Sequence, residues 1–358
     1  MKTIRYQLSL LILCLLSAAI CLLLYHHSIS PSSKAVEVVS ETEGDYIKWV
    51  DFNVSYEALC TAYDLDVASY DSPVHLNWIE LLAYVGAKCG GSFDQESISL
   101  INKLAGELSE GEVTLDILTK DLKYYDYYYE AYNAVLGGMV GEYEIEQANE
   151  SGQKIWKKVY GLKAFSPIAK GFPYNDYDDF GSSRSYGYKR QHLGHDMMGQ
   201  IGTPIVAIES GYVEALGWNQ YGGWRIGIRS FDGRRYYYYA HLRQNFPYAL
   251  DLEEGSIVTA GDVIGYMGHT GYSTKENTNN IDTVHLHWGL QLIFDESQKE
   301  GSNEIWIDCY ALTRFLYKNR SLTEKNAETK EWFRSFQMKD PAVTEFQNKP
   351  VKTGDNSV

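Results

Sequence analysis

The stretch that decides both fold and site is residues 191–288, which opens with His192-Leu193-Gly194-His195-Asp196 and closes with His285-Leu286-His287-Trp288. Between these two motifs lies a third, Tyr239-Ala240-His241-Leu242. Six of the nine histidines of the chain fall within this stretch. Neutral imidazoles together with one carboxylate are the ligands that catalytic zinc sites use. The stretch therefore predicts a zinc site.

The spacing within the two outer motifs allows their side chains to converge. Side chains at i and i+2 of a strand share one face, so His285 and His287 can point into one cavity. His192 and Asp196, four residues apart around Gly194, can both reach a metal from a turn. Either motif alone is common by chance, and an isolated histidine is usually a buried core residue. Their combination is much more specific, whereas the roles of His195 and His269 stay open.

The residues around these motifs have a sequence pattern typical of antiparallel β-structure. From Gly161 onward, short β-prone runs alternate with glycine turns, and Asp232-Gly233 between two such runs is typical of a hairpin. The helices that parallel β-α-β units need are missing from the pattern. We therefore expect an antiparallel β-sandwich or partial barrel over residues 160–320, closed by a helix over 303–318.

Helical patterns dominate the region before this β-rich domain. Residues 76–89 carry apolar side chains at helical spacing, and Gly90-Gly91 stops the pattern. We expect a small all-α domain over residues 51–150, which makes the fold class α+β. The tyrosine cluster that begins at Tyr124 is typical of core packing with hydroxyls at the rim; stacking on sugar rings is the alternative. This domain could also contact a protein partner.

The N-terminus carries the features of a membrane anchor. Lys2 and Arg5 precede an uncharged run over residues 8–25, which is close to the shortest length that spans a bilayer. We expect an uncleaved signal anchor over residues 1–28, with a cleaved signal peptide as the rival. Because the positive flank stays in the cytoplasm, the body of this single-pass protein of the cell membrane would be extracytoplasmic.

Composition restricts the remaining segments and partners. Residues 29–50 are polar and acidic, which is typical of a linker, and residues 321–358 are poor in hydrophobic side chains, so we expect a flexible tail. The formal net charge of −15 argues against nucleic acid as a partner, because phosphate binding needs clustered lysine and arginine.

At its three histidine motifs the chain resembles the lysostaphin/LytM-type zinc metallopeptidases, which have the duplicated hybrid motif β fold. The landmarks of that family are an HxxxD motif, a YAHL strand and a C-terminal HLHF-like strand. This chain has His192 to Asp196, Tyr239 to Leu242 and His285 to Trp288 at the matching places, and a glycine-rich turn-strand-turn over residues 261–268. The resemblance covers about residues 160–295.

The resemblance implies roles for five residues. His192, Asp196 and His287 would hold Zn²⁺, and His241 and His285 would be the catalytic pair. It also implies an endopeptidase that hydrolyses peptide bonds of peptidoglycan cross-bridges or stem peptides. The apolar run over residues 8–25, which lies outside the resemblance, would tether this enzyme to the membrane. A catalytically silent or regulated scaffold or activator of the same fold, on the wall side of the membrane, is the alternative.

Overall fold

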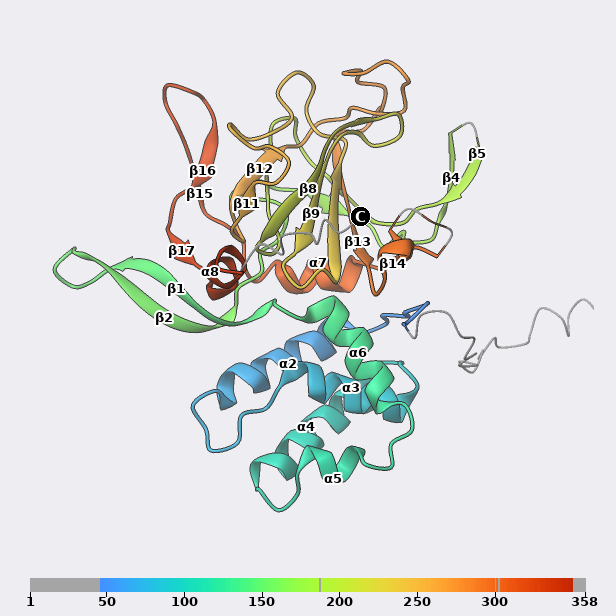
Figure 1. The fold of residues 1–358 in the computed structure, drawn as a ribbon, viewed down its shortest axis with the longest axis vertical. Helices are drawn as coiled ribbons and strands as arrows, with labels where there is room; N and C mark the ends of the chain where they lie inside the picture. Colours follow the sequence, from blue (N-terminus) through green and yellow to red (C-terminus); the bar gives the residue numbers. More distant parts are fainter. Residues whose placement is uncertain (1–45, 187, 300, 302, 350–358) are drawn as a thin grey trace, which may run out of the picture. The chain divides into compact units, whose positions relative to one another are not determined.

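The computed structural model describes residues 46–349 apart from 187, 300 and 302 (Figure 1). The expected anchor over residues 1–28 and most of the expected linker lie outside the described residues. Within the described part of the chain, none of the helices combines the length and the apolar character that a membrane span requires.

Five helices follow one another in the first third of the described chain, as the sequence patterns predict. Asn77 and Asp94 accept hydrogen bonds from the first backbone amides of the helices that they precede, and Gly90 ends the second helix in the left-handed conformation with φ of 64°. The helices are α2 (Tyr56–Ser69), α3 (Trp78–Cys89), α4 (Gln95–Ser109), α5 (Leu115–Thr119) and α6 (Tyr125–Leu136).

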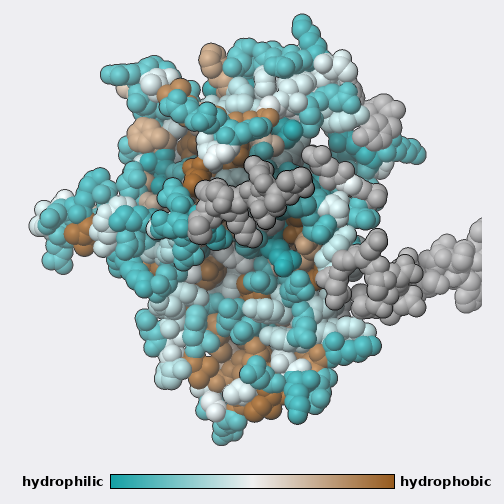
Figure 2. Space-filling view, viewed as in Figure 1, coloured by the Kyte–Doolittle hydropathy of each residue, from teal (hydrophilic) through white to brown (hydrophobic). Residues whose placement is uncertain are grey.

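The tyrosine cluster of α6 contributes to the core of these helices. Tyr132 is fully buried and makes an edge contact with Phe52, with ring centroids 5.6 Å apart. Gly86 of α3 lies against the same tyrosine, since a Cβ atom at this position would be 2.9 Å from the tyrosine hydroxyl. Core packing therefore accounts for this part of the cluster. Figure 2 shows hydrophobic residues gathered over the lower, helical part of this face.

The helical region ends earlier than the expected boundary at residue 150. Gly138, at φ of 80°, turns the chain out of α6, and β1 (Val140–Ala148) then pairs with β2 (Lys154–Leu162) in a hairpin. Within β1, glutamate occurs at every second position from Glu142 to Glu146, which is the period of a strand and not of a helix. The expected helical domain thus includes a strand at its C-terminal end.

The β-rich region is built on an eight-stranded sheet with strand order β11-β8-β9-β10-β13-β6-β3, and β14 also pairs with β13. Every register pair in it is antiparallel. Mixed α+β structure with antiparallel sheets is therefore confirmed, and the described strands form no closed barrel. The strands are β3 (Asn175–Asp176), β6 (His195–Met198), β8 (Gly211–Asn219), β9 (Gly223–Ser230), β10 (Arg235–Ala240), β11 (Ile257–Val258), β13 (His285–Leu292) and β14 (Ile305–Ile307).

Two of the smaller sheets are two-stranded pairs within the β-rich region. β7 (Pro204–Val206) pairs with β12 (Val263–Tyr266), and β4 (Ser183–Tyr186) forms a hairpin with β5 (Tyr188–Gln191) just before the first histidine motif. The closing segment over 303–318 is not one helix: it contains β14 followed by α7 (Tyr310–Leu316), because Ile305 and Ile307 are buried on the edge of β13. A short 3₁₀ helix, η1 (Glu296–Gln298), precedes it.

The segment expected to be a flexible tail contains regular elements up to residue 347. They are β15 (Thr323–Lys325), β16 (Trp332–Arg334), β17 (Met338–Lys339) and α8 (Pro341–Gln347). Contacts with distant residues explain the difference: the amide of Trp332 donates to the hydroxyl of Tyr266 at 3.0 Å, and buried Asp340 pairs with Lys163 at 2.7 Å. Residues 350–358 lie outside the described part.

A buried arginine joins the helical region to the large sheet. Arg235 of β10, only 1% exposed, pairs with Glu209, with N···O distances of 2.7 and 3.1 Å. The same guanidinium donates to the backbone carbonyls of Ala134 at 3.0 Å and Asn133 at 3.4 Å, near the C-terminal end of α6. Free carbonyls at a helix C-terminus need such donors.

Candidate metal centre

Strand β13 lies at the centre of the candidate site. Its register places His287 directly opposite Asp196 of β6 on one side and Ala240 of β10 on the other. Opposite residues of antiparallel strands present their side chains on the same face. His192 precedes β6 in a turn that passes over the imidazole of His287. A Cβ atom on Gly194 would lie 2.5 Å from that ring, so this close approach requires glycine.

His192, Asp196 and His287 form a compact cluster of potential metal ligands. Nε2 of His192 lies 3.0 Å from Oδ1 of Asp196 and 3.0 Å from Nδ1 of His287, and the last two atoms are 2.9 Å apart. Zinc binds such atoms at about 2.0–2.1 Å in tetrahedral geometry, which separates neighbouring ligand atoms by about 3.3 Å. The triangle is therefore close to the size of one face of a zinc tetrahedron.

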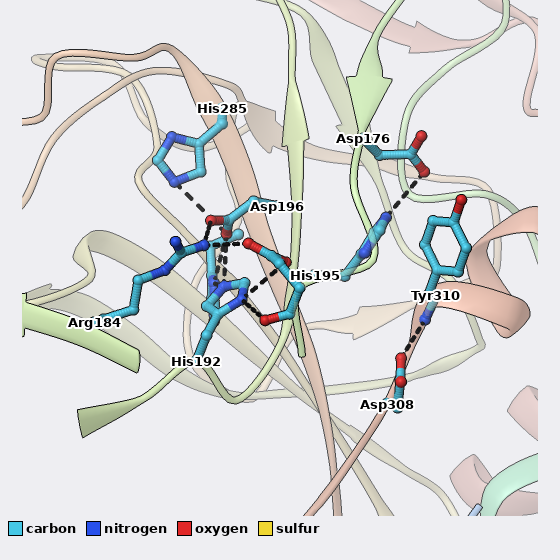
Figure 3. Close-up of polar contacts among 10 residues, drawn as sticks. Asp176, Arg184, His192, His195, Asp196, His285, Asp308 and Tyr310 are labelled. Carbon is cyan, nitrogen blue, oxygen red and sulfur yellow. Dashed lines mark hydrogen bonds and ion pairs between the residues drawn. The ribbon is translucent and has the colours of Figure 1, made fainter. Parts of the chain in front are cut away.

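Asp179 and Arg184 hold the first two members of this cluster in place (Figure 3). Nδ1 of His192 lies 3.1 Å from a carboxylate oxygen of Asp179 and 3.4 Å from its carbonyl oxygen, so this nitrogen donates its proton and Nε2 keeps its lone pair. Arg184 of β4 pairs with Asp179 and also reaches Oδ2 of Asp196 at 3.3 Å. The other oxygen of Asp196 faces the histidines.

The electrostatics of the cluster produce protonation states that suit a cation. Burial opposes ionisation of Asp196, but hydrogen bonds with His192 and His287 outweigh it and hold the pKa of the carboxyl well below its usual range. Burial lowers the pKa of His287. Burial also opposes protonation of His192, yet the hydrogen bond and negative charge of Asp196 raise its pKa. A metal cation would compete with that proton for the same lone pair.

His241 and His285 face the cluster from its other side. Each uses Nδ1 to donate to a backbone carbonyl, His241 to Thr270 at 3.0 Å and His285 to Thr283 at 2.8 Å, so each Nε2 keeps a lone pair. Nε2 of His285 is 3.7 Å from Oδ1 of Asp196, and the rings of His285 and His241 are 4.7 Å apart. Burial lowers the pKa of His241 well below its usual value.

The backbone of His241 is in an uncommon conformation. Its φ of 62° places it in the left-handed region, which costs a residue with a side chain about 1–2 kcal/mol. The turn that imposes this conformation is held by the amide of His241, which donates to Gly222 at 2.8 Å, and by its carbonyl, which accepts from Gly268 at 3.0 Å. Strained residues of this kind cluster at functional sites.

The other two histidines of the decisive stretch lie apart from the cluster. His195 alternates with Asp196 along β6 and so points to the opposite face, where its Nε2 lies 3.0 Å from Asp176 and its ring 5.5 Å from that of Tyr310 (Figure 3). His269 is half-buried, and its Nδ1 donates to the carbonyl of Ile281 at 2.7 Å. Both therefore have structural partners.

The cluster opens into a groove of about 670 Å³. All five histidine and aspartate side chains of the two predicted sets line it, together with residues of β9, β10 and β13. Aromatic rings fit against the sheet because glycines face them: a Cβ atom on Gly289 would be 2.8 Å from the ring of Trp306. A groove of this volume is large enough for a short peptide.

Sequence comparison places this site in a known family. Residues 190–300 match the profile of peptidase family M23. The chain carries an M23 peptidase domain. The M23 domain contains every histidine and aspartate of the cluster described above, whereas Asp179 and Arg184 lie just before the matched residues.

Relatives of the M23 domain include characterised enzymes. The chain is 34% identical to an L-Ala–D-Glu endopeptidase of Bacillus subtilis (strain 168) over 154 residues, 43% of this chain and 44% of that protein. It is 42% identical to lysostaphin of Staphylococcus simulans over 98 residues, 27% of this chain and 17% of that protein. The matches thus span less than half the length of these relatives.

Comparison with solved structures finds partial matches. One is a putative glycyl-glycine endopeptidase lytM from Ruminococcus gnavus, which is 26% identical with a TM-score of 0.48, over 77% of this chain and 92% of that chain. Another is the catalytic domain of lysostaphin from Staphylococcus simulans, 30% identical with a TM-score of 0.31, over 39% of this chain and 92% of that chain.

Proposed function

We propose that this chain is a zinc-dependent endopeptidase that hydrolyses peptide bonds of peptidoglycan. The observation that carries the proposal is the triangle of His192, Asp196 and His287, whose ligand atoms lie 2.9–3.0 Å apart on one face of the sheet. Similarity of the M23 domain to enzymes named as L-Ala–D-Glu endopeptidase and lysostaphin supports a wall peptide as the substrate.

Zinc suits this donor set, since two imidazole nitrogens and one carboxylate oxygen leave a coordination position open. A bound zinc would supply Lewis acidity, which makes water nucleophilic near neutral pH and polarises the scissile carbonyl. The complete ligand triangle favours an enzyme over the silent scaffold, which would not need it.

His241 and His285 would move the protons of the reaction. Their Nδ1 protons are fixed on backbone carbonyls, so Nε2 is the nitrogen that can accept a proton from the attacking water. The low pKa of His241 keeps its imidazole neutral at pH 7 and thus able to accept. The same Nε2 can then return the proton to the leaving amine nitrogen. Whichever imidazole is protonated can also donate to the developing oxyanion.

We further propose that the enzyme is anchored in the cell membrane by residues 8–25 and works on the extracytoplasmic, wall side. The uncharged run and the preceding Lys2 and Arg5 support this orientation. A net charge of −15 gives the body no attraction to an anionic wall, and a covalent tether would keep it there. The helical region α2–α6 remains a candidate surface for a protein partner.

The test is digestion of purified peptidoglycan by the full chain, with fragments read by mass. Wild type should release muropeptides, and a chelator should stop the release until zinc is restored. Asp196→Ala and His287→Ala should lose both zinc and activity, while His269→Gln, a histidine outside the cluster, should retain both. An unchanged fragment profile with and without chelator would overturn the enzyme and favour the scaffold.

A further inference from the structure

The groove beside the histidine cluster differs in charge from the rest of the chain. The full chain carries a formal charge of −15, but the groove is lined by four cationic side chains and only two acidic ones. The cations are Arg184, Arg190, Arg225 and Lys299, and the acids are Asp196 and Glu304. A local excess of positive charge in an acidic protein marks a place where an anion is bound.

Two of the four cations already have carboxylate partners. Arg184 pairs with Asp179 and Asp196, and Lys299 pairs with Glu214 at 2.9 Å. Arg190 and Arg225 form no ion pair within residues 46–349, the gaps at 187, 300 and 302 excepted, and the Nε atom of each is buried without a hydrogen-bond partner. A buried N–H donor that lacks an acceptor is costly, so an additional acceptor near either guanidinium would be stabilising.

Both arginines line the groove near Tyr238, and Arg190 precedes the candidate metal ligand His192 by two residues. Arg190 donates to the hydroxyl of Tyr272, whose ring is 6.0 Å from that of His241. Arg225 extends from β9 beside Tyr236. Tyr238 connects them: its ring is 6.0 Å from His287, and although burial raises the pKa of its hydroxyl, the positive charges of Arg225 and Arg190 both oppose the rise.

Each of these guanidiniums donates to a tyrosine hydroxyl, and most of its N–H groups are not used by that contact. Arginine presents five N–H groups in a planar fork that matches a carboxylate, and such charge-assisted pairs are roughly twice as strong as neutral hydrogen bonds. The two forks line the path that a peptide would follow past His287. A substrate made only of glycine would bring no side-chain carboxylate to either of them.

We propose that Arg190 and Arg225 bind free carboxylates of the substrate, so that the groove takes an acidic stem-peptide segment in preference to a neutral glycyl cross-bridge. This inference rests on the proposed function and specifies its substrate. Arg190 and Arg225 act here as specificity-determining residues, and the proton-transfer steps stay with His241 and His285.

The experiment compares two synthetic stem peptides that differ at one group, a free carboxylate in one and a carboxamide in the other, with a pentaglycine peptide blocked at both ends as the neutral bridge. Zinc-loaded full chain should cleave the acidic peptide with kcat/KM higher than the amide by about tenfold or more. Arg225→Gln and Arg190→Gln should each reduce this ratio, mainly through KM of the acidic peptide. Added salt should weaken binding of the acidic peptide more than binding of the amide.

Lys299→Gln is the matched control, because it removes a groove cation that Glu214 already neutralises. It should change the acid-to-amide ratio by less than about twofold. Zinc content and the unfolding midpoint are measured for every variant. Values equal to those of wild type exclude loss of the metal site or of the fold as the cause of a changed ratio. Equal kcat/KM for acid and amide, or faster cleavage of pentaglycine, overturns the inference while leaving the endopeptidase intact.

Calorimetric binding of the same three peptides to the zinc-loaded chain separates this inference from the proposed function. Tighter binding of the acidic peptide, if Arg225→Gln abolishes the difference, supports the carboxylate site even when no peptide is cleaved. Absence of cleavage would overturn only the proposed endopeptidase activity. Equal binding of acid and amide overturns the carboxylate site whether or not cleavage occurs.

Discussion

Asp179 determines which nitrogen of His192 is available to a metal. Its carboxylate and carbonyl oxygens both face Nδ1, and it shares Arg184 with Asp196. Outer partners of this kind orient a ligand and fix its tautomer, and their loss weakens metal binding without removing a ligand. One residue thus connects the β4–β5 hairpin to both of the ligands that follow it.

Asp179→Asn should therefore lower zinc affinity by about 10- to 100-fold. The amide cannot compensate the charge of Arg184, which is then free to draw Asp196 away from the histidines. Competition with a chromogenic chelator measures the affinity directly. Asp178→Asn is the control: this neighbour is exposed, and its substitution should leave affinity unchanged. Equal losses in the two variants would show that Asp179 has no special role.

Sequence alone predicts all five residues that the structure brings together, because one turn motif, one strand motif and one further family landmark include them. The sequence does not predict that Asp179 and Arg184 contact the cluster. They precede His192 without a recognisable spacing, and their approach depends on how the β4–β5 hairpin folds back. The sequence also does not single out Arg225. Only the structure shows that Lys299 and Arg184 have carboxylate partners while Arg225 has none.

At the scale of elements, the local sequence pattern predicts helices and strands well. It fails for segments whose structure depends on contacts with residues distant in the sequence. The pattern over residues 76–89 and its stop at Gly90 predict a helix that the structure has at Trp78–Cys89. Residues 321–347 are short of apolar side chains, so nothing local predicts their strands and helix. Their order comes from residues elsewhere, such as Tyr266 and Lys163, and tertiary contacts of that kind override weak local propensity.

The contact between α6 and β10 yields a prediction about stability. Arg235→Met should destabilise the chain by about 3–5 kcal/mol, because it leaves the nearly buried Glu209 without its cation and the carbonyl of Ala134 without this donor. Urea unfolding measures the loss. Arg234→Met removes a neighbouring, exposed arginine whose ion pair with Glu130 is at 3.6 Å, and should cost less than about 1 kcal/mol. Similar losses in both variants would contradict the assignment.

At the scale of the whole molecule, the metal centre connects strands β6 and β13 with the turn before β6. Zinc that binds only the folded chain adds RT ln(1 + [Zn]/Kd) to stability, about 2.7 kcal/mol at a hundredfold excess over Kd. Chelation should therefore lower Tm by roughly 5–10 °C. Thermal unfolding followed by circular dichroism checks this. Asp196→Ala should unfold at one temperature with or without chelator, and a chelator effect that persists in this variant would place the zinc elsewhere.

Arg235 has a consequence for how this protein can diverge. Its acceptors on α6 are main-chain oxygens of residues 133 and 134, which every amino acid supplies. The exposed side chain at residue 133 can change in descendants without disturbing the junction, provided that the helix keeps its length and its end, whereas Ala134 is buried and has little room to change. An alignment would then show variation at residue 133 although its main-chain oxygen belongs to the junction. Insertions or deletions in α6, rather than substitutions, are the changes that selection would remove.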